Sequence, residues 1–152
     1  MDTAVKPQGC TNLKLRQLGR RVGQHYDAEM RRVGLKTTQY SLLSFVCKLG
    51  PIRPTDLART LGLQPSTLSR NLKPLVAAGW LEMLPGDDAR SLRVAVTPAG
   101  REKRAEAQRR WRVAQEGINA ALGPQRVVAL HALIDECTAL LAPVEDEGDV
   151  DE

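Results

Sequence analysis

The sequence predicts a mainly helical protein with one small β-hairpin, and three observations support this fold class. Hydrophobic residues make up 42% of the 152-residue chain but aromatic residues only 3%, a balance that suits helices rich in leucine and alanine. Apolar residues recur three or four positions apart through most of the chain, as they do on one face of a helix. A stretch after Gly79 instead alternates apolar and polar residues beside a turn, as in a hairpin. The length allows one domain with a core of its own.

The N-terminal third predicts two helices. From Leu13 to Val33, a long helix carries one apolar stripe opposite an arginine-rich side. A second helix is expected to begin at a Thr37 or Thr38 cap and to stop before Gly50 and its following proline, because proline cannot continue a helix. The residues expected to lie in its core face are Leu42, Leu43, Phe45, Val46 and Leu49.

Two short helices joined through a glycine follow. Thr55 is the expected cap of the first helix, with Asp56 in its first turn, and Gly62 supplies the left-handed residue that ends it. Pro65 suits the first position of the second helix, where a missing N–H costs nothing. The second helix is expected to bury Leu68, Leu72, Leu75 and Val76. This pattern predicts a helix-turn-helix.

The stretches "WLEML" and "SLRVAV" are the expected strands of the hairpin. Between them, residues Pro85 to Arg90 have the composition of a turn. A hairpin directly after a helix-turn-helix is the arrangement of a winged helix, so this turn is the predicted tip of the wing.

Two long helices are expected to close the chain. Thr97 and Pro98 mark the start of one that reaches about Leu122, and Gly123 and its following proline break it. The last helix has an apolar seam at Val127, Leu130, Ile134, Cys137 and Leu141. The first helix and these two have more apolar surface than a small winged helix can cover. A second copy of the chain in a closed two-fold dimer is the simplest partner.

The second short helix carries a polar face opposite its leucines. Arg70 on this face can bond guanine bidentately in a major groove, and the hydroxyls and Lys73 can contact phosphates or base edges. An ordinary solvated face is the alternative, but the cap, glycine and proline that precede the helix favour DNA recognition. The predicted DNA contacts of this helix are Gln64, Pro65, Ser66, Thr67, Ser69, Arg70 and Lys73.

The predicted wing adds Asp88, Arg90 and Arg93 as DNA-binding residues. Asp88 is expected to pair with one arginine and hold the loop, while the other arginine enters a minor groove. The alternative is a surface ion pair that contributes less than ~1 kcal/mol.

Charge points to the same class of partner. Residues 145–152 contain six acidic residues and no basic one, and are expected to form a disordered tail. Without those six the chain has 22 basic and 12 acidic residues, a net charge of +10. A body this basic favours a polyanionic partner, most often nucleic acid, although a solvated charged surface is the alternative.

Nothing in the sequence predicts an enzyme, a metal site or a cofactor, because catalytic, nucleotide-binding and metal-ligand motifs are missing. Three scattered cysteines favour a reducing cytoplasm. No signal peptide or membrane span is expected. Cys10, just before the first helix, is a candidate redox-active thiol because the helix dipole can lower its pKa; an inert thiol is the alternative. Cys47 and Cys137 are expected to be structural.

The segments "DLARTLGLQPSTLSRNLKPLVAAGWLE" and "GDDARSLRVAVTPAG" resemble the recognition helix and the wing of the MarR family of bacterial transcriptional regulators. Val96 stands in for the leucine of the family's L-T-x-x-G helix start. The resemblance extends from about Leu13 to Leu141. It implies an obligate homodimer whose terminal helices intertwine and whose two lobes read the half-sites of a palindromic operator. Members commonly repress genes until a small aromatic or phenolic anion, or an oxidant, changes the spacing of the lobes.

The resemblance also implies roles for particular residues. The polar face of the second short helix takes the major-groove role and Arg90 the wing role. The family's effector pocket lies where the dimerisation helices meet the DNA-binding lobe, which makes Arg16, Phe45 and Trp111 candidate ligand contacts. In the peroxide-sensing branch an N-terminal cysteine is accompanied by tyrosines, whereas the matching positions here hold Lys14 and Gln24.

Five regions are therefore predicted: an N-terminal arm (1–12), dimerisation and core helices (13–50), a winged DNA-binding lobe (51–97), C-terminal dimerisation helices (98–144) and the acidic tail (145–152). The function expected is that of a homodimeric, sequence-specific repressor of the cytoplasm, released from DNA by a small aromatic ligand. The alternatives are a redox regulator using Cys10, an architectural DNA-binding protein without a ligand, and a winged helix used for protein contacts.

Overall fold

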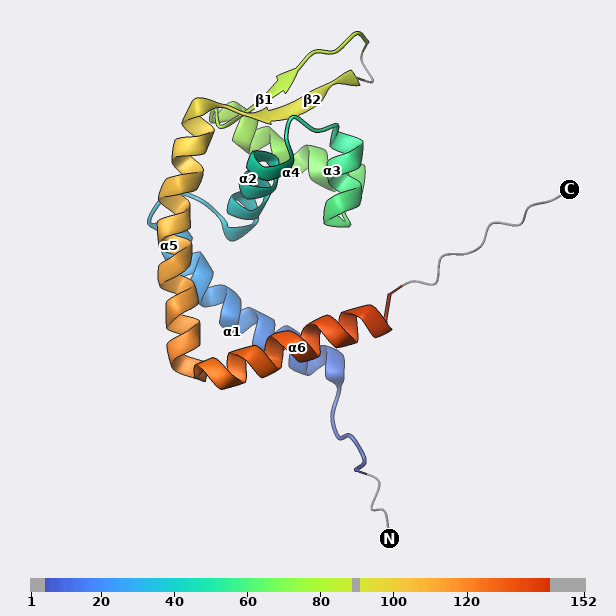
Figure 1. Ribbon diagram of the computed structural model, residues 1–152, viewed down its shortest axis with the longest axis vertical. Helices are drawn as coiled ribbons and strands as arrows, with labels where there is room; N and C mark the ends of the chain where they lie inside the picture. Colours follow the sequence, from blue (N-terminus) through green and yellow to red (C-terminus); the bar gives the residue numbers. More distant parts are fainter. Residues whose placement is uncertain (1–4, 89–90, 143–152) are drawn as a thin grey trace, which may run out of the picture. The chain divides into compact units, whose positions relative to one another are not determined.

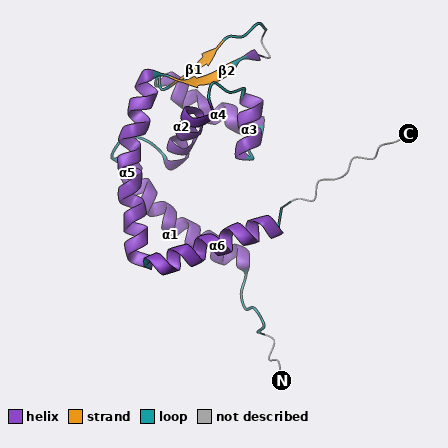
Figure 2. Cartoon of the chain, in the orientation of Figure 1, coloured by secondary structure: helices purple, strands orange, loops and turns teal. Residues whose placement is uncertain are grey.

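The computed structural model describes residues 5–88 and 91–142, and the chain divides into two compact units, residues 1–115 and 116–152. The predicted tail and the arginine of the predicted wing tip, Arg90, lie outside the described residues. The elements in chain order are α1 (Thr11–Arg31), α2 (Thr37–Leu49), α3 (Pro54–Leu61), α4 (Pro65–Ala77), β1 (Leu81–Leu84), β2 (Arg93–Val96), α5 (Pro98–Leu122) and α6 (Pro124–Leu140) (Figures 1 and 2). Mostly helical structure with one antiparallel hairpin confirms the predicted fold class.

The first core holds together α2, α3, α4 and the hairpin (Figure 1). Alternating residues of the two strands face it, because side chains one position apart on a strand point to opposite sides. Outside the hairpin proper, Ile52 pairs with Val94 as an isolated bridge, which ties the loop before α3 to β2. The buried residues of this core are Leu42, Leu43, Val46, Leu57, Ala58, Leu68, Leu72, Leu75, Leu81 and Val94.

A second core joins the end of α1 to the start of α2 and to α5. It consists of Met30, Val33, Leu35, Tyr40 and Ala107, with Trp80 and Trp111 packed against it.

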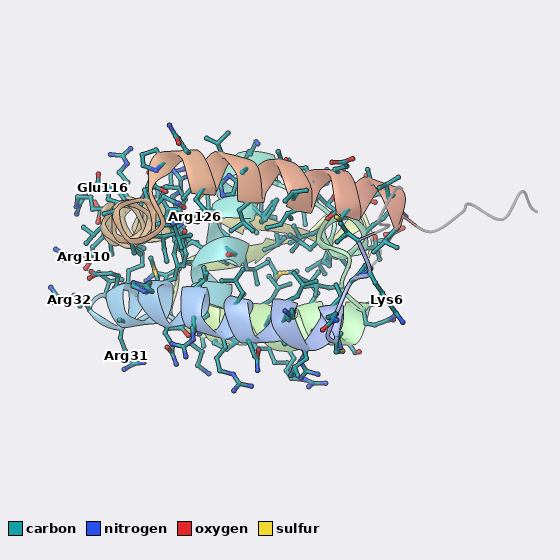
Figure 3. All side chains as sticks on the ribbon, turned by 90° about the horizontal axis from the view of Figure 1, so that it is seen from below. Lys6, Arg31, Arg32, Arg110, Glu116 and Arg126 are labelled. Atoms are coloured by element: carbon teal, nitrogen blue, oxygen red, sulfur yellow. The ribbon has the colours of Figure 1, made fainter. Side chains whose placement is uncertain are left out.

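Polar contacts reinforce the attachment of α1 to α5. Glu29 lies 3.5 Å from Nη1 of Arg110 and 3.9 Å from Nε of Arg32; both arginines are labelled in Figure 3. The Tyr26 hydroxyl donates a hydrogen bond to Oε1 of Gln115. Burial raises the pKa of Tyr26, so the phenol stays protonated and able to donate this bond.

The joint between the hairpin and α5 is formed by the predicted cap Thr97. Its hydroxyl group accepts a hydrogen bond from the Gly100 N–H at 3.0 Å and donates one to the Gly79 carbonyl at 2.6 Å. Gly100 packs so closely on the backbone that an added Cβ would lie 1.9 Å from the Trp80 carbonyl oxygen. Nζ of Lys103 lies 5.3 Å from the centre of the Trp80 ring, a cation–π distance.

Two of the predicted helix caps are wrong. The N-cap of α2 is Lys36, whose backbone N–H donates to the Gln39 side chain at 2.9 Å. Thr37 is already helical, and its hydroxyl instead donates to the Asp27 carboxylate at 2.6 Å. In α3 the first helical residue is Pro54 rather than a residue after Thr55, because the fixed φ of proline suits the first helical position.

Two predicted core residues of α2 are also exposed. Phe45 is 38% exposed and Leu49 39% exposed. The buried face of α2 passes through Tyr40, Leu43 and Val46, so both residues lie outside the face that the rest of the unit covers.

Several other large apolar side chains are exposed in α1 and α6. In α1 these are Leu13, Leu15 and Leu18; in α6 and just after it they are Val128, Leu133, Ile134, Leu140 and Leu141. Only Val127 of α6 is buried. None of the helices formed by the described residues combines the length and apolarity that a membrane span requires.

Candidate nucleic-acid interface

The turn between α3 and α4 sets the direction of α4. Gly62, with φ +64°, ends α3 in the left-handed conformation that glycine adopts without strain. The Leu63 N–H then donates to the Ala58 carbonyl at 2.9 Å. Pro65 is the first residue of α4, as predicted, and the Leu68 N–H donates to the carbonyl of the N-cap Gln64 at 3.0 Å. The glycine that ends α3 and the proline that begins α4 therefore fix the turn of the helix-turn-helix.

Helix α4 is divided into a buried face and an exposed polar face. Leu68, Leu72 and Leu75 are buried in the first core. Of the predicted DNA contacts on this helix, Thr67 is half-buried. The exposed ones are Gln64, Pro65, Ser66, Ser69, Arg70 and Lys73. The fold therefore collects the predicted contacts of α4 on one accessible surface.

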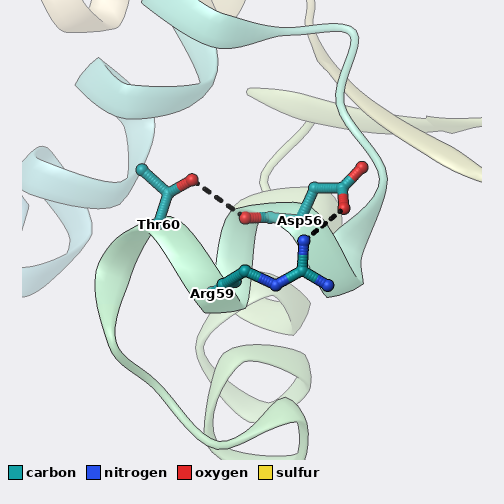
Figure 4. Close-up of polar contacts among 3 residues, drawn as sticks. All are labelled: Asp56, Arg59 and Thr60. Atoms are coloured by element: carbon teal, nitrogen blue, oxygen red, sulfur yellow. Dashed lines mark hydrogen bonds and ion pairs between the residues drawn. The ribbon is translucent and has the colours of Figure 1, made fainter. Parts of the chain in front are cut away.

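The charges of this surface are not neutralised within the described part of the chain. There, neither Arg70 nor Lys73 has an acidic partner within ion-pair distance. The cation of α3 is different: Nη1 of Arg59 lies 3.5 Å from Oδ1 of Asp56 (Figure 4). Thr60 in the same figure donates to the Asp56 carbonyl at 2.9 Å, a bond within the helix.

An apolar hollow of about 440 Å³ borders the polar face of α4. Three of its residues, Pro65, Ser69 and Lys73, are predicted DNA contacts on α4. Others come from the start of α3 and from β1: Pro54, Thr55 and Met83. The start of α3 and the polar face of α4 therefore border the same hollow.

The wing is a regular antiparallel ladder closed by side-chain hydrogen bonds. Leu81 pairs with Val96 and Leu84 with Arg93. The Ser91 N–H donates to Oδ1 of Asp88 at 3.0 Å, and the Asp88 N–H donates to the Ser91 hydroxyl at 3.0 Å. The Ser91 hydroxyl also donates to the Asp88 carbonyl at 2.8 Å. Ser91 was not among the residues predicted from the sequence, although aspartate and serine are both common turn residues.

The other predicted wing residues are placed in part. Arg93 is exposed at the start of β2. Of the two arginines predicted as partners of Asp88, Arg90 lies outside the described residues. The structure thus places the predicted contacts of α4 on one exposed face, and Arg93 and Asp88 on the hairpin that follows this helix.

The three candidate ligand contacts do not lie together. Phe45 lines a hollow of about 480 Å³ with Ser44, Cys47, Lys48, Arg101 and Arg104. Trp111 packs against the second core, and Arg16 lies exposed in α1.

The hollow beside Phe45 is cationic. Arg101 and Arg104 come from α5 and Lys48 from α2, and the lining has no acidic residue. The buried Nε of Arg104 and the buried hydroxyl of Ser44 have no hydrogen-bond partner. Burial raises the pKa of the Cys47 thiol, and the positive charges of Arg104 and Arg101 oppose this effect.

Cys10 is exposed and is the N-cap residue of α1. In the described residues, no three His, Cys, Asp or Glu side chains group closely enough to hold a metal ion.

Residues 33–91, which include the helix-turn-helix and the first strand of the wing, match the sequence model of the MarR family. The chain is 30% identical to the M. tuberculosis transcriptional regulator MosR, whose crystal structure contains DNA; the match covers 88% of this chain and 99% of that one, with a TM-score of 0.69.

Two curated relatives are also transcriptional regulators or resistance proteins by name. The multiple antibiotic resistance protein MarR of Salmonella typhimurium is 34% identical over 67 residues, which are 43% of this chain and 46% of that protein. The uncharacterized HTH-type transcriptional regulator YwoH of Bacillus subtilis is 25% identical over 90 residues, 59% of this chain and 66% of that protein. The chain thus spans less than two thirds of either relative. None of these proteins is named as an enzyme.

Proposed function

The chain belongs to the MarR family, and we propose that it is a transcriptional regulator that binds double-stranded DNA in a sequence-specific way. The observation that carries the proposal is the exposed face of α4, which includes Arg70 and Lys73. The glycine that ends α3 and the proline that begins α4 set the direction of this helix. The hairpin that follows directly is the second part of the interface. The DNA in the crystals of the related MosR supports the same assignment.

The proposed contacts divide by chemistry. Arg70 would bond a guanine edge in the major groove, and Lys73 and the hydroxyls of α4 would bond phosphates or base edges. Of Arg90 and Arg93, one would pair with Asp88 and the other would reach the neighbouring minor groove, while the hydrogen bonds between Asp88 and Ser91 would hold the shape of the wing loop.

We propose that two copies of the chain form the binding unit. The exposed leucines of α1 and the exposed apolar residues of α6 support this, because large apolar side chains of this number rarely stay in contact with water. A two-fold dimer would present two α4 helices to successive half-sites of a palindromic operator.

We further propose that the protein is a repressor and that a small aromatic or phenolic anion releases it. Support comes from the hollow beside Phe45, which is lined by this aromatic residue and by Arg101 and Arg104. Arg16 and Trp111 lie elsewhere, and their roles in ligand binding would require the second subunit.

Two alternative functions differ from this proposal in how DNA binding is regulated. A redox regulator using Cys10 has the exposure of that thiol in its favour, and an architectural protein would need no effector at all.

The proposal is tested by a mobility-shift assay on the DNA upstream of the chain's own gene, with aromatic acids and with peroxide. DNA binding through several phosphates should weaken steeply with salt, with a log–log slope of about −0.9 for each phosphate neutralised. Replacing Arg70 and Arg90 together by alanine should abolish the preference for this DNA. Binding without sequence preference would favour the architectural rival, and affinity that both replacements leave intact would reject the interface.

A further inference from the structure

The pair formed by Asp56 and Arg59 stands out on the surface of α3. Nη1 of Arg59 lies 3.5 Å from Oδ1 of Asp56, one helical turn away, and the side chains are 81% and 48% exposed (Figure 4). Asp56 is the one acidic residue of this helix. A pair this exposed is weak and exchanges readily with other partners.

The position of the pair relates it to the polar face of α4. Thr55 lines the hollow that also contains Ser69 and Lys73 of α4. Residues four apart lie on the same face of a helix, so Arg59 continues the face of α3 that begins at Thr55. In a helix-turn-helix whose second helix enters the major groove, the first helix crosses the DNA backbone.

We propose that Arg59 binds a DNA phosphate and that Asp56 restrains it. In the free protein the carboxylate of Asp56 holds the guanidinium group; on DNA the phosphate replaces the carboxylate, because the fork of an arginine fits both anions. The pair therefore lowers the affinity for any duplex, whatever its sequence. This inference rests on the proposed DNA-binding function.

The size of the effect follows from the exposure of the pair. Measured exposed ion pairs change an equilibrium by about two- to fivefold at most. Removing the charge of Asp56 should therefore tighten DNA binding by about that factor at low salt. Removing Arg59 should lose one phosphate contact, which reduces the log–log salt slope by about 0.9.

The experiment measures the binding of a fluorescein-labelled duplex of mixed sequence by fluorescence anisotropy over a range of salt concentrations. The variants are Asp56→Asn, Arg59→Ala and the double variant. The control is Glu102→Gln on α5, an exposed position where the net charge changes by the same amount. Asp56→Asn should bind more tightly than Glu102→Gln does. In the Arg59→Ala background, Asp56→Asn should increase the affinity for the duplex no more than Glu102→Gln does.

A fold control accompanies these variants, because Asp56 also lies in the first turn of α3, where a negative charge is favourable. Asp56→Glu retains the charge and should bind DNA as the original chain does, and thermal unfolding should show each variant to be folded.

The proposal fails if Asp56→Asn binds no more tightly than the control, or if Arg59→Ala keeps both the original affinity and the original slope. If the unchanged chain binds no duplex at any salt concentration, the proposed function itself has failed.

Discussion

Gly100→Ala is a substitution for which the structure predicts a clear loss of stability away from the DNA-binding face. Gly100 lies in the first turn of α5, and the Cβ of an alanine would meet the Trp80 carbonyl oxygen at 1.9 Å and the Trp80 carbonyl carbon at 2.8 Å. Both are backbone atoms, so no rotation of a side chain relieves the clash. The same carbonyl accepts the Thr97 N–H at 3.1 Å. Moving it would strain the joint between the hairpin and α5.

The magnitude follows from two destabilising terms and one stabilising term. Overpacking of a filled site costs about 1–3 kcal/mol, and a hydrogen bond lost at the joint costs about 1 kcal/mol more. Alanine in place of glycine returns at most about 1 kcal/mol of helix propensity. The net loss of unfolding free energy should be about 2 kcal/mol. For a chain of this size that loss lowers the melting temperature by about 4–8 °C.

Gly117→Ala is the matched control on the same helix. An added Cβ there has no heavy atom within 4 Å, so only the propensity term remains, and the melting temperature should rise by a few degrees. Thermal unfolding followed by circular dichroism at one fixed protein concentration measures both variants. A Gly100→Ala protein as stable as the original, or shifted in the same direction as Gly117→Ala, would refute the close packing of the joint.

Three further predictions concern the wing, a buried phenol and the thiols. Ser91→Ala removes the two hydrogen bonds that the Ser91 hydroxyl makes with the Asp88 backbone. Anisotropy should show weaker DNA binding, while the melting temperature changes little, and unchanged binding would contradict the role of the loop. Burial raises the pKa of Tyr26 above 10.0; its contribution to stability is fully present below pH 10 and is lost as the pH rises through the raised pKa, so in urea titrations Tyr26→Phe should lack part of the alkaline loss. Iodoacetamide should alkylate Cys10 faster than Cys47, because burial raises the pKa of Cys47; peptide mass spectrometry that finds the reverse order would be inconsistent with this placement.

What the sequence could predict was local. The glycine that ends α3, the proline that starts α4 and the Thr97 cap of α5 act within one turn of the residues that carry them, so a single sequence contains all the information they need. The polar face of α4 was predicted for the same reason, because the leucine spacing fixes the opposite side.

What the sequence could not predict depends on parts of the chain that lie far apart. Phe45 has the spacing of a core residue, but which face of α2 is covered is decided by α1, α4 and β2, and those leave Phe45 exposed. The hollow that it lines needs the arginines of α5. Thr37 is a residue type that often caps helices, but its hydroxyl instead donates a hydrogen bond to the Asp27 carboxylate of α1. In each case a tertiary contact replaced the partner that the local pattern implied.

The distribution of ion pairs separates the charges that hold the fold from those available to a partner. Glu29 binds Arg110 across α1 and α5, and its side chain is only 19% exposed, so salt screens this pair weakly. Within the described residues, Arg70, Lys73 and Arg93 have no acidic partner and lie exposed. Their interaction with a polyanion weakens as the salt concentration rises, because counterions then return to the polyanion. Rising salt should therefore release DNA at concentrations that leave the helical circular dichroism signal unchanged, since the two kinds of charge respond to salt differently.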